Sequence, residues 1–387
     1  MKLGLIGVGQ AGGKIVEALM AYEANSRASF IVEAIAVNSA KADLLGLERV
    51  PLDNRILIGQ SRVKGHGAGA DNELGAELAQ EDIDEIRGAV DEMPTHEIDA
   101  FLVIAGLGGG TGSGGAPVIA REINRVYTEP VYGLGALPGQ DEGGIYTLNA
   151  ARSIQTFVRE TDNLILVDND GWRNGGESLG AGYKAINDDI ARRLGILFSA
   201  GETDDEDAVA ESVVDASEII NTLGTGGITT IGYSTSHIER AKSGFLSRLS
   251  GSKPEPIDTQ NQIVSTVRMA ALGRLTLPCE ITSAERALIV IAGPPAYLDR
   301  KGFERSRKWL EEATGTMEVR GGDYPVPDSE YLAAVVVLSG VSNVPRIKQL
   351  QQVAVETQQS MRDISDESDA ALTDLTWSGD GDIEPLF

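Results

Sequence analysis

The chain has 387 residues, enough for about two domains, and its 42% share of apolar residues is typical of a soluble globular protein. Its formal net charge of −25 repels nucleic acid and anionic lipid, which excludes a general basic binding surface and a nucleic-acid partner. No apolar window reaches the length of a transmembrane segment, and we read residues 1–7 as a first strand rather than a signal peptide.

The charge and the single cysteine indicate the salt and redox environment of the protein. Arg is more frequent than Lys and acidic residues occur along most of the chain, a pattern typical of proteins that stay soluble in high salt. An ordinary acidic protein is the alternative. Cys279 excludes an internal disulfide and fits a reducing compartment. We expect a halophilic, cytoplasmic protein whose association with the cell envelope is at most indirect or peripheral.

Residues 1–180 alternate short apolar runs with helical stretches, a pattern that predicts a Rossmann-like α/β domain with a parallel sheet. A central linking segment over 181–204 follows, with a helix at Gly182–Phe198 and an acidic loop that begins at Gly201. The predicted strands of the first domain are Lys2–Val8, Ile31–Asn38, Arg55–Ile58, Ala100–Ala105, Val131–Leu137 and Leu164–Val167.

Residues 205–362 have a different rhythm, which predicts a second, α+β domain. The segment 363–387 contains no Lys or Arg and is rich in Asp, Ser, Gly and Thr, so we expect an acidic, disordered tail. The predicted strands of this half are Ile228–Tyr233, Ala287–Ala292 and Tyr331–Leu338, and the predicted helices lie near Ile263–Leu272, Arg300–Glu312 and Arg346–Met361.

The run Gly108–Gly114 lies between a predicted strand and a predicted helix of the first half. Glycines let the backbone approach a phosphate closely, and the N–H groups of the first helical turn point at it. A flexible turn is the alternative, but it does not need five glycines in seven positions with Thr111 and Ser113 among them. The run therefore predicts a phosphate-binding loop.

An earlier glycine loop, Gly7–Gly12, fits the pattern G-x-G-x-x-G and leads into a helix start at Gly12-Gly13-Lys14. Alone it suggests a dinucleotide fold, and an NAD-dependent oxidoreductase is the alternative that it leaves open. The acidic residue expected at the end of the second strand is missing, however, because that strand ends at Asn38. Together, the two glycine loops predict phosphates held between two helix N-termini.

These two loops resemble those of the tubulin/FtsZ superfamily of polymerising GTPases, and within it the archaeal tubulin-like CetZ group. The resemblance covers about residues 1–345 and implies a tubulin/FtsZ fold, binding of GTP or GDP with Mg²⁺, and hydrolysis of GTP. It also implies head-to-tail filaments of the chain with itself, which could join laterally into sheets. The loop residues implied to contact GTP are Gly9, Gln10, Ala11, Gly12, Gly13, Lys14, Gly108, Gly109, Gly110, Thr111, Gly112 and Ser113.

Two further segments resemble nucleotide loops of this superfamily. Asn38–Asp43 is similar to the second loop, which implies a GTP contact from Asn38. Pro138–Gly143 is similar to the fifth, where Glu142 would accept hydrogen bonds from the ribose hydroxyls. Tyr146 stands where bacterial FtsZ usually has an arginine, so no phosphate role is carried over to it.

Three residues are candidates for reading the base. Asn169 follows a predicted strand and is placed like the guanine-reading asparagine of the superfamily. Tyr183 and Asn187 lie four residues apart and so share one face of a helix, where the ring could stack on guanine and the amide could reach its edge. The alternative is an ordinary amphipathic helix face. With the glycine loops in place, we expect guanine recognition.

The segment Val214–Glu218 resembles the superfamily loop whose acidic side chains act on the nucleotide of the next subunit. Asp215 and Glu218 fit its pattern N-x-D-x-x-D/E, whereas Val213 replaces the asparagine. At this spacing both carboxylates lie near one side of a helix start and could orient a water at the γ-phosphate. The alternative is that Asp215 caps the helix and Glu218 completes a capping box, and both interpretations can hold together.

The predicted function is a cytoskeletal GTPase that controls cell shape and hydrolyses GTP at subunit contacts. An FtsZ-like division filament is one alternative, and a GTP-binding structural protein with little hydrolysis is another, favoured by Val213. The three histidines, His66, His96 and His237, lack metal-ligand spacing, so the sequence assigns no metal ligands. Glu239–Gln262 resembles the loop that makes lateral contacts between tubulin protofilaments, with a solvated loop as the alternative.

Overall fold

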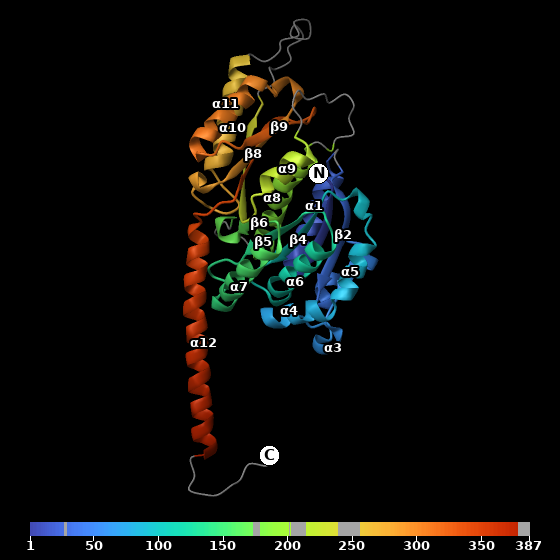
Figure 1. Cartoon of the computed structure of the whole chain (residues 1–387), viewed down its shortest axis with the longest axis vertical. Coiled ribbons are helices and arrows are strands. Elements are labelled where there is room, and N and C mark those ends of the chain that lie inside the picture. The colour runs from blue at the N-terminus through green and yellow to red at the C-terminus, as the bar shows by residue number, and fades with distance from the viewer. Residues whose placement is uncertain (27–28, 173–178, 201, 203–213, 239–255, 378–387) are drawn as a thin grey trace.

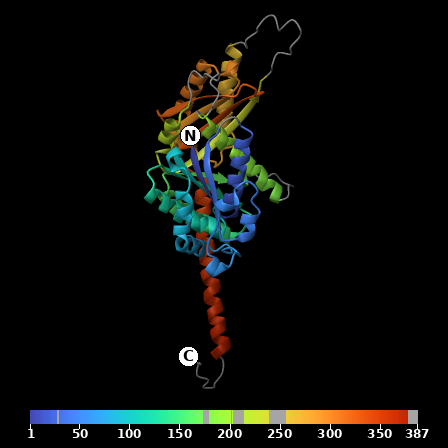
Figure 2. The ribbon, with the colours of Figure 1, turned by 90° about the vertical axis from the view of Figure 1, so that its right-hand side faces the viewer.

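The structure, a computed structural model, describes residues 1–26, 29–172, 179–200, 202, 214–238 and 256–377 (Figure 1). The body is elongated, with the first half of the chain at one end and the second half at the other. Helix α12 (Pro345–Trp377) leaves this body and extends past the first half. A view turned by 90° shows the same projection (Figure 2).

The first half forms six parallel strands in the order β3-β2-β1-β4-β5-β6. All six predicted strands are confirmed. Strands that are covered on both faces read as continuous apolar runs, and β1 and β5 are indeed buried at every residue. The bounds are β1 Leu3–Val8, β2 Ile31–Asn38, β3 Arg55–Leu57, β4 Ala100–Gly106, β5 Val131–Leu137 and β6 Asn163–Asp168.

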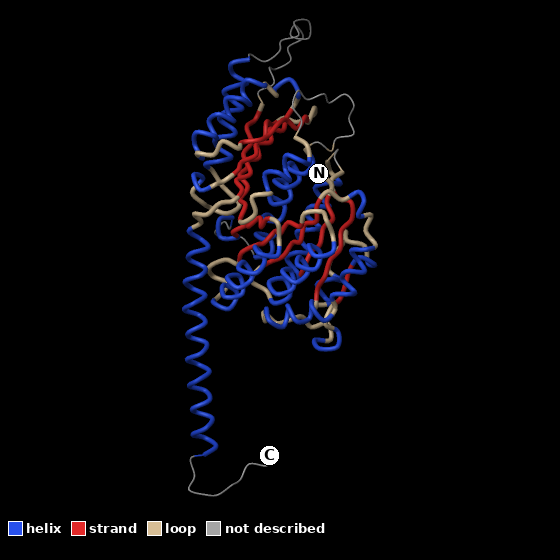
Figure 3. Tube along the Cα trace, viewed as in Figure 1, coloured by secondary structure: helices blue, strands red, loops and turns tan. Residues whose placement is uncertain are grey.

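Helices cover both faces of these strands (Figure 3). Ile15 of α1 and Ile190 of α8 belong to the apolar cluster on one face, whereas Ile119 of α6 and Ile154 of α7 belong to the cluster on the other. The predicted central helix is confirmed as α8. The bounds are α1 Gly9–Ala24, α2 Lys41–Leu45, α3 Gln60–Val63, α4 Asn72–Glu81, α5 Ile83–Asp91, α6 Gly110–Val126, α7 Gly144–Glu160 and α8 Leu179–Ser199.

The second half continues the same sheet, because β7 pairs in parallel with β6 through Leu164–Ile228 and Ile165–Thr229. Strand β10 lies between β7 and β8 and is antiparallel to both, and β9 pairs in parallel with β8. The predicted strands and helices are confirmed, and β9 is an additional strand. The bounds are α9 Ala216–Leu223, β7 Ile228–His237, α10 Pro256–Leu272, β8 Arg286–Gly293, α11 Arg300–Thr314, β9 Val319–Pro325 and β10 Tyr331–Ser339.

Two apolar clusters form the main core, one on each face of the ten-stranded sheet. Successive residues of a strand point to opposite faces, so Phe101 joins one cluster and Leu102 the other. Ile289 and Val290 of β8 divide in the same way. Each cluster therefore runs through both halves of the chain, and the division into two domains at residue 180 stays a prediction.

The prediction that residues 363–387 are disordered is wrong for residues 363–377, which continue α12 as a helix. Nucleation is the unfavourable step in helix formation, and each further residue then adds a backbone hydrogen bond. The first part of α12 is held by packing on α7, where Ala354 joins an apolar cluster with α7 residues. The acidic segment therefore extends a helix that already exists, and the Gln359 amide donates to Asp363 across the junction at 2.8 Å.

Candidate functional site

The two glycine loops lie in contact because their strands, β1 and β4, are neighbours in register. Gly9 has a φ of +73°, and a Cβ on it would lie 3.0 Å from the amide nitrogen of Gly112 in the other loop. A Cβ on Gly12 would lie 2.2 Å from the carbonyl oxygen of Ile104. At these positions only glycine lets the backbones approach so closely.

Both loops end in the N-terminus of a long helix, α1 with 16 residues and α6 with 17. Within the described chain, neither helix has a side-chain cap or an acidic residue in its first turn. The first N–H groups of the two helices are therefore left for another acceptor, and the positive ends of the helix dipoles favour an anion. This arrangement fits the phosphates of a nucleotide.

Exposure divides the loop residues into two groups. Gln10, Ala11 and Gly109 are exposed and so are accessible to a ligand. Gly109 is also the N-cap of α6, and a Cβ added to it would meet no atom within 4 Å among the described residues. The buried residues that support the loops are Gly9, Gly12, Gly13, Gly108, Gly110, Thr111, Gly112 and Ser113.

Polar side chains behind the loops bind one another. The hydroxyl groups of Ser39 and Thr111 share a hydrogen bond of 2.6 Å, which ties the end of β2 to α6. Asp43 accepts from the side-chain amides of Gln10 and Asn38, each at 3.2 Å. The structure thus brings Asn38, predicted from the second loop, next to Gln10 of the first.

The side chain of Lys14 is engaged at the end of α2. Its Nζ donates to the carbonyl oxygen of Gly46 at 2.6 Å and lies 3.1 Å from Oε2 of Glu17. A Cβ on the preceding Gly13 would meet the side chain of Leu47 at 3.3 Å. A GTP contact from Lys14 stays a prediction, and in the structure the side chain is held by Gly46 and Glu17 instead.

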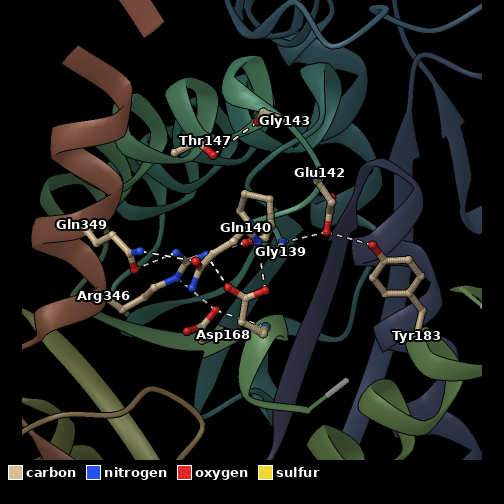
Figure 4. Close-up of polar contacts among 11 residues, drawn as sticks. Gly139, Gln140, Glu142, Gly143, Thr147, Asp168, Tyr183, Arg346 and Gln349 are labelled. Carbon is tan, nitrogen blue, oxygen red and sulfur yellow. Dashed lines mark hydrogen bonds and ion pairs between the residues drawn. The ribbon is translucent and has the colours of Figure 1, made fainter. Parts of the chain in front are cut away.

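Two residues predicted for the ribose and the base are in direct contact. Oε1 of Glu142 accepts from the amide of Gly139 at 2.7 Å and from the hydroxyl group of Tyr183 at 2.8 Å (Figure 4). This pair links the loop after β5 with α8. Asn187 lies one turn further along α8 and is half-buried, and Asn169 is buried directly after β6.

Arg346 at the start of α12 holds the same loop, and the sequence analysis missed it. Its guanidinium donates to the carbonyl oxygen of Pro138 at 2.9 Å and pairs with Asp168 at 3.3 Å and Asp170 at 3.2 Å (Figure 4). Asp170 in turn accepts from the amide of Gln140 at 2.9 Å. Burial raises the pKa of Asp168 although Arg346 opposes this shift. Two carboxylates at the end of β6 were the only signal for such a cation.

The predicted catalytic pair lies at the start of α9. Asp215 is the N-cap, and its carboxylate accepts from the amide of Glu218 at 3.0 Å and the hydroxyl of Ser217 at 2.6 Å. These two bonds lower the pKa of Asp215. Burial and then the nearby Asp215 raise the pKa of Glu218, whose Oε2 is buried without a hydrogen-bond partner among the described residues. The capping interpretation is thus correct for Asp215, whereas Oε2 of Glu218 has no hydrogen bond to the described residues that would hold it in a capping box.

This pair and the glycine loops lie at opposite edges of the sheet. The loops follow the carboxyl ends of β1 and β4. In contrast, α9 leads into the start of β7, which pairs with the amino end of β6 at Leu164. The side-chain amide of Asn163, the first residue of β6, also donates to the carbonyl oxygen of Leu223, the last residue of α9, at 2.9 Å. Glu218 cannot therefore reach a nucleotide bound by the glycine loops of its own chain.

Several predictions fall outside the described residues. These are Val213, most of the acidic loop from Gly201, the segment 239–255 of the lateral-contact loop and the end of the tail, residues 378–387. Within the described part, no three His, Cys, Asp or Glu side chains are grouped so that they could hold a metal ion. No described helix combines the length and the hydropathy that a membrane crossing requires.

Comparisons with known proteins identify the family. The family description "Tubulin/FtsZ family, GTPase domain" matches residues 2–176, and "Tubulin-like CetZ, C-terminal domain" matches residues 176–356. The tubulin-like protein CetZ3 of Haloferax volcanii is 65% identical over the full length of both chains. The chain belongs to the tubulin-like CetZ family.

Solved structures of CetZ proteins are also similar to this chain. A GDP-bound monomer of CetZ1 from Haloferax volcanii is 61% identical, with a TM-score of 0.83, and covers 92% of this chain and 100% of its own. A GTPγS-bound protofilament of CetZ2 from the same organism is 46% identical, with a TM-score of 0.84, and covers 94% and 100%. These findings confirm the CetZ resemblance and the tubulin/FtsZ fold.

The match of the first half to a GTPase domain decides between the two functions that the first glycine loop left open. It supports a CetZ GTPase and not an NAD-dependent oxidoreductase. The contacts of individual residues with GTP, and the catalytic roles of Asp215 and Glu218, stay predictions.

Proposed function

We propose that this chain assembles head to tail into filaments and hydrolyses GTP where two subunits meet. The observation that carries the proposal is the position of Asp215 and Glu218 on the edge of the sheet opposite to the glycine loops. When one copy stacks on the next, the acidic pair of one faces the nucleotide edge of the other. Such a heterologous contact does not close on itself and therefore gives a filament.

Each group of residues has a separate role in the proposed reaction. The first N–H groups of α1 and α6 hold the phosphates, Glu142 accepts the ribose hydroxyls, and Asn169 and Asn187 read guanine. Mg²⁺ would be bound mainly by phosphate and water oxygens, and it would neutralise charge on the phosphates. Glu218 of the neighbouring subunit, positioned beside Asp215, orients the attacking water and accepts its proton. Loss of the γ-phosphate then weakens the contact.

Assembly can be tested through the dependence of turnover on protein concentration. Each active site needs two chains, so GTP turnover should rise more steeply than linearly with concentration. Turnover and sedimentation of filaments should also begin at the same concentration. A turnover that is strictly proportional to protein concentration would place the whole site within one subunit and overturn the proposal.

Guanine recognition is testable through Asn187. GTP should displace a bound fluorescent nucleotide from the unmodified chain at a much lower concentration than ATP does. Asn187→Ala should lower the ratio of the ATP to the GTP dissociation constant by about tenfold, the scale of a hydrogen bond to the base edge. Asn124→Ala, at an exposed position of α6, is the matched control and should leave the difference unchanged. Fluorescent-nucleotide competition measures both. Equal affinity of the unmodified chain for ATP and GTP would contradict the assignment.

For the cellular task, we propose control of cell shape, with a division filament as the alternative. The resemblance to the CetZ group favours shape. Imaging of a tagged copy in growing cells distinguishes the two, because mobile patches along the envelope indicate shape control and a ring at mid-cell indicates division.

A further inference from the structure

The last part of α12, residues 360–377, carries an exposed apolar stripe, and we call this part the tail helix. Met361, Ile364, Leu372 and Leu375 are 49%, 67%, 59% and 78% exposed, and their spacing places them on one face of the helix. At its start, Met361 and Ile364 line a shallow groove with Gly144 and Ile145 of α7, and beyond this turn the segment stands clear of the body in both views (Figures 1 and 2). An apolar stripe on an isolated helix in water indicates a missing partner.

The charge of the tail helix limits what that partner can be. Its sequence contains one basic residue, Arg362, and five acidic residues, Asp363, Asp366, Glu367, Asp369 and Asp374. Pairing of two tail helices would bring like charges together, which is unfavourable at close range. The partner surface should therefore be basic and should also offer apolar side chains.

The chain itself has such a surface on the outer side of α10 and α11, which we call the α10–α11 seam. The guanidinium of Arg268 lies 5.2 Å from the ring centre of Trp309, and Arg305 donates to Asn261 at 3.2 Å, so these contacts fix the two helices side by side. Met269 and Leu272 beside them are 59% and 64% exposed. The seam consists of Arg268, Met269, Leu272, Lys301, Arg305, Lys308 and Trp309.

The basic residues of the seam lack acidic partners. Among the described residues, no carboxylate forms an ion pair with Arg268, Lys301, Arg305 or Lys308, although each of the four is exposed. Such a set of unpaired cations stands out in a chain whose net charge is −25. The seam therefore matches the tail helix in both properties, with exposed apolar side chains set among basic ones.

The seam and the tail helix lie at opposite ends of the molecule. In Figures 1 and 2, α12 runs in line with the α10 and α11 layer, and it extends beyond α3 and α4 at the nucleotide edge. A copy that stacks on this edge presents its second half to the first copy. In such a stack, the seam of the added copy comes beside the tail helix.

We propose that the tail helix of one subunit docks on the α10–α11 seam of the next subunit along the filament. This inference rests on the proposed head-to-tail assembly. The apolar stripe packs against Leu272 and Trp309, and the carboxylates of the tail helix face Lys301 and Lys308. In molar salt the Debye length is only about 3 Å, so the apolar contact supplies most of the affinity and the charges select the partner at close range.

Cysteine crosslinking tests the contact directly. One sample carries Ile364→Cys and the other Leu272→Cys, and the two are mixed with GTP and a short bismaleimide reagent. The native Cys279 can stay, because burial raises its pKa to about 11 and unmodified protein provides its background. We expect a crosslinked dimer that needs both cysteines and GTP. A dimer from Ile364→Cys alone that persists when Cys279→Ser is added would show that tail helices pair with each other and would overturn the proposal.

Sedimentation of the unmodified protein in the same experiment separates this inference from the proposed function. Absence of filaments would overturn the proposed assembly and the docking with it. Filaments without the mixed crosslink would overturn only the docking.

The energetic contribution is measured by the critical concentration for assembly. The double variant Ile364→Ser with Leu375→Ser should raise it by about tenfold or more, because two large apolar side chains lose their partner surface. Val355→Ser is the matched control, since Val355 is 68% exposed on the same helix but lies off the stripe, and it should change the value less than about twofold. GTP binding by the monomer should not change in either variant. Equal critical concentrations of the double variant and the control would contradict the docking.

Discussion

Glu218→Ala should lower the turnover of GTP in filaments by about a hundredfold or more and leave the GTP affinity of the monomer unchanged. The size is that expected for losing a positioned acid–base group. Affinity should persist because Glu218 lies at the opposite edge of the sheet from the glycine loops of its own chain. The fold should also persist, since Oε2 of Glu218 has no hydrogen-bond partner among the described residues that the substitution would orphan.

Two controls make this result specific. Glu85→Ala, at an exposed position of α5, removes a carboxylate far from α9 and should leave turnover unchanged. Asp215→Ala is less informative, because Asp215 also caps α9 and its loss would destabilise the helix. In mixtures, Glu218→Ala should co-assemble with unmodified subunits and reduce their turnover. Normal turnover in this variant would mean that the carboxylate has no part in the reaction.

The pH profile should report the same residue. Burial raises the pKa of Glu218, and its role as proton acceptor needs the carboxylate form. Turnover of the unmodified protein should therefore fall as the pH drops through this raised pKa. Glu218→Gln should remove the decline that this group causes, and a decline of unchanged shape would assign the titration to another group.

Gly109→Ala should weaken GTP binding by roughly tenfold to a hundredfold without lowering the melting temperature. The backbone of Gly109 has a φ of −73°, which alanine adopts readily, and the added Cβ would meet no described atom within 4 Å. The only expected clash is with a phosphate on the first turn of α6. Losing charge-assisted hydrogen bonds there accounts for the size of the effect.

Two other glycines provide the comparison, with affinity measured by calorimetry and stability by thermal unfolding. Gly88→Ala, also with open space around the added Cβ, should keep both GTP affinity and melting temperature. Gly12→Ala should lose both, because its Cβ would lie 2.2 Å from the carbonyl oxygen of Ile104. Unchanged GTP affinity in Gly109→Ala would show that the phosphates do not approach this residue.

The sequence predicts the parts of the molecule that depend on local patterns. Strands β1 and β5 are buried at every residue and read as nearly continuous apolar runs, and the glycine loops are short segments whose spacing has a direct geometric meaning. Strand β9 could not be read in this way, because Gly321 and Gly322 interrupt it and its place is set by pairing with β8. The acidic composition of residues 363–377 predicts disorder, but these residues continue a helix. The packing of α12 on α7, which holds the start of this helix, cannot be read from composition.

Contacts between residues that are far apart in the sequence could not be predicted either, because they too depend on packing. Asp168 and Arg346 are separated by 178 positions, and neither local sequence indicates that the two side chains are in contact. Likewise, the hydrogen bond between Glu142 and Tyr183 depends on how α8 crosses the loop after β5. Sequence reasoning identified Glu142 and Tyr183 as separate candidates but could not give their contact.

Arg346 also connects the loop after β5 to the start of a long helix. The helix in whose first turn it lies has 33 residues, so it reaches about 50 Å from the contact with the loop after β5, and a tilt of about 5° there would move its far end by roughly 4 Å. Helix α7, on which α12 packs, begins directly after the same loop at Gly144, so the two helices would swing together. A small rearrangement of the loop after β5 would therefore produce a larger displacement at the far end of α12, well beyond the reach of any side chain in that loop.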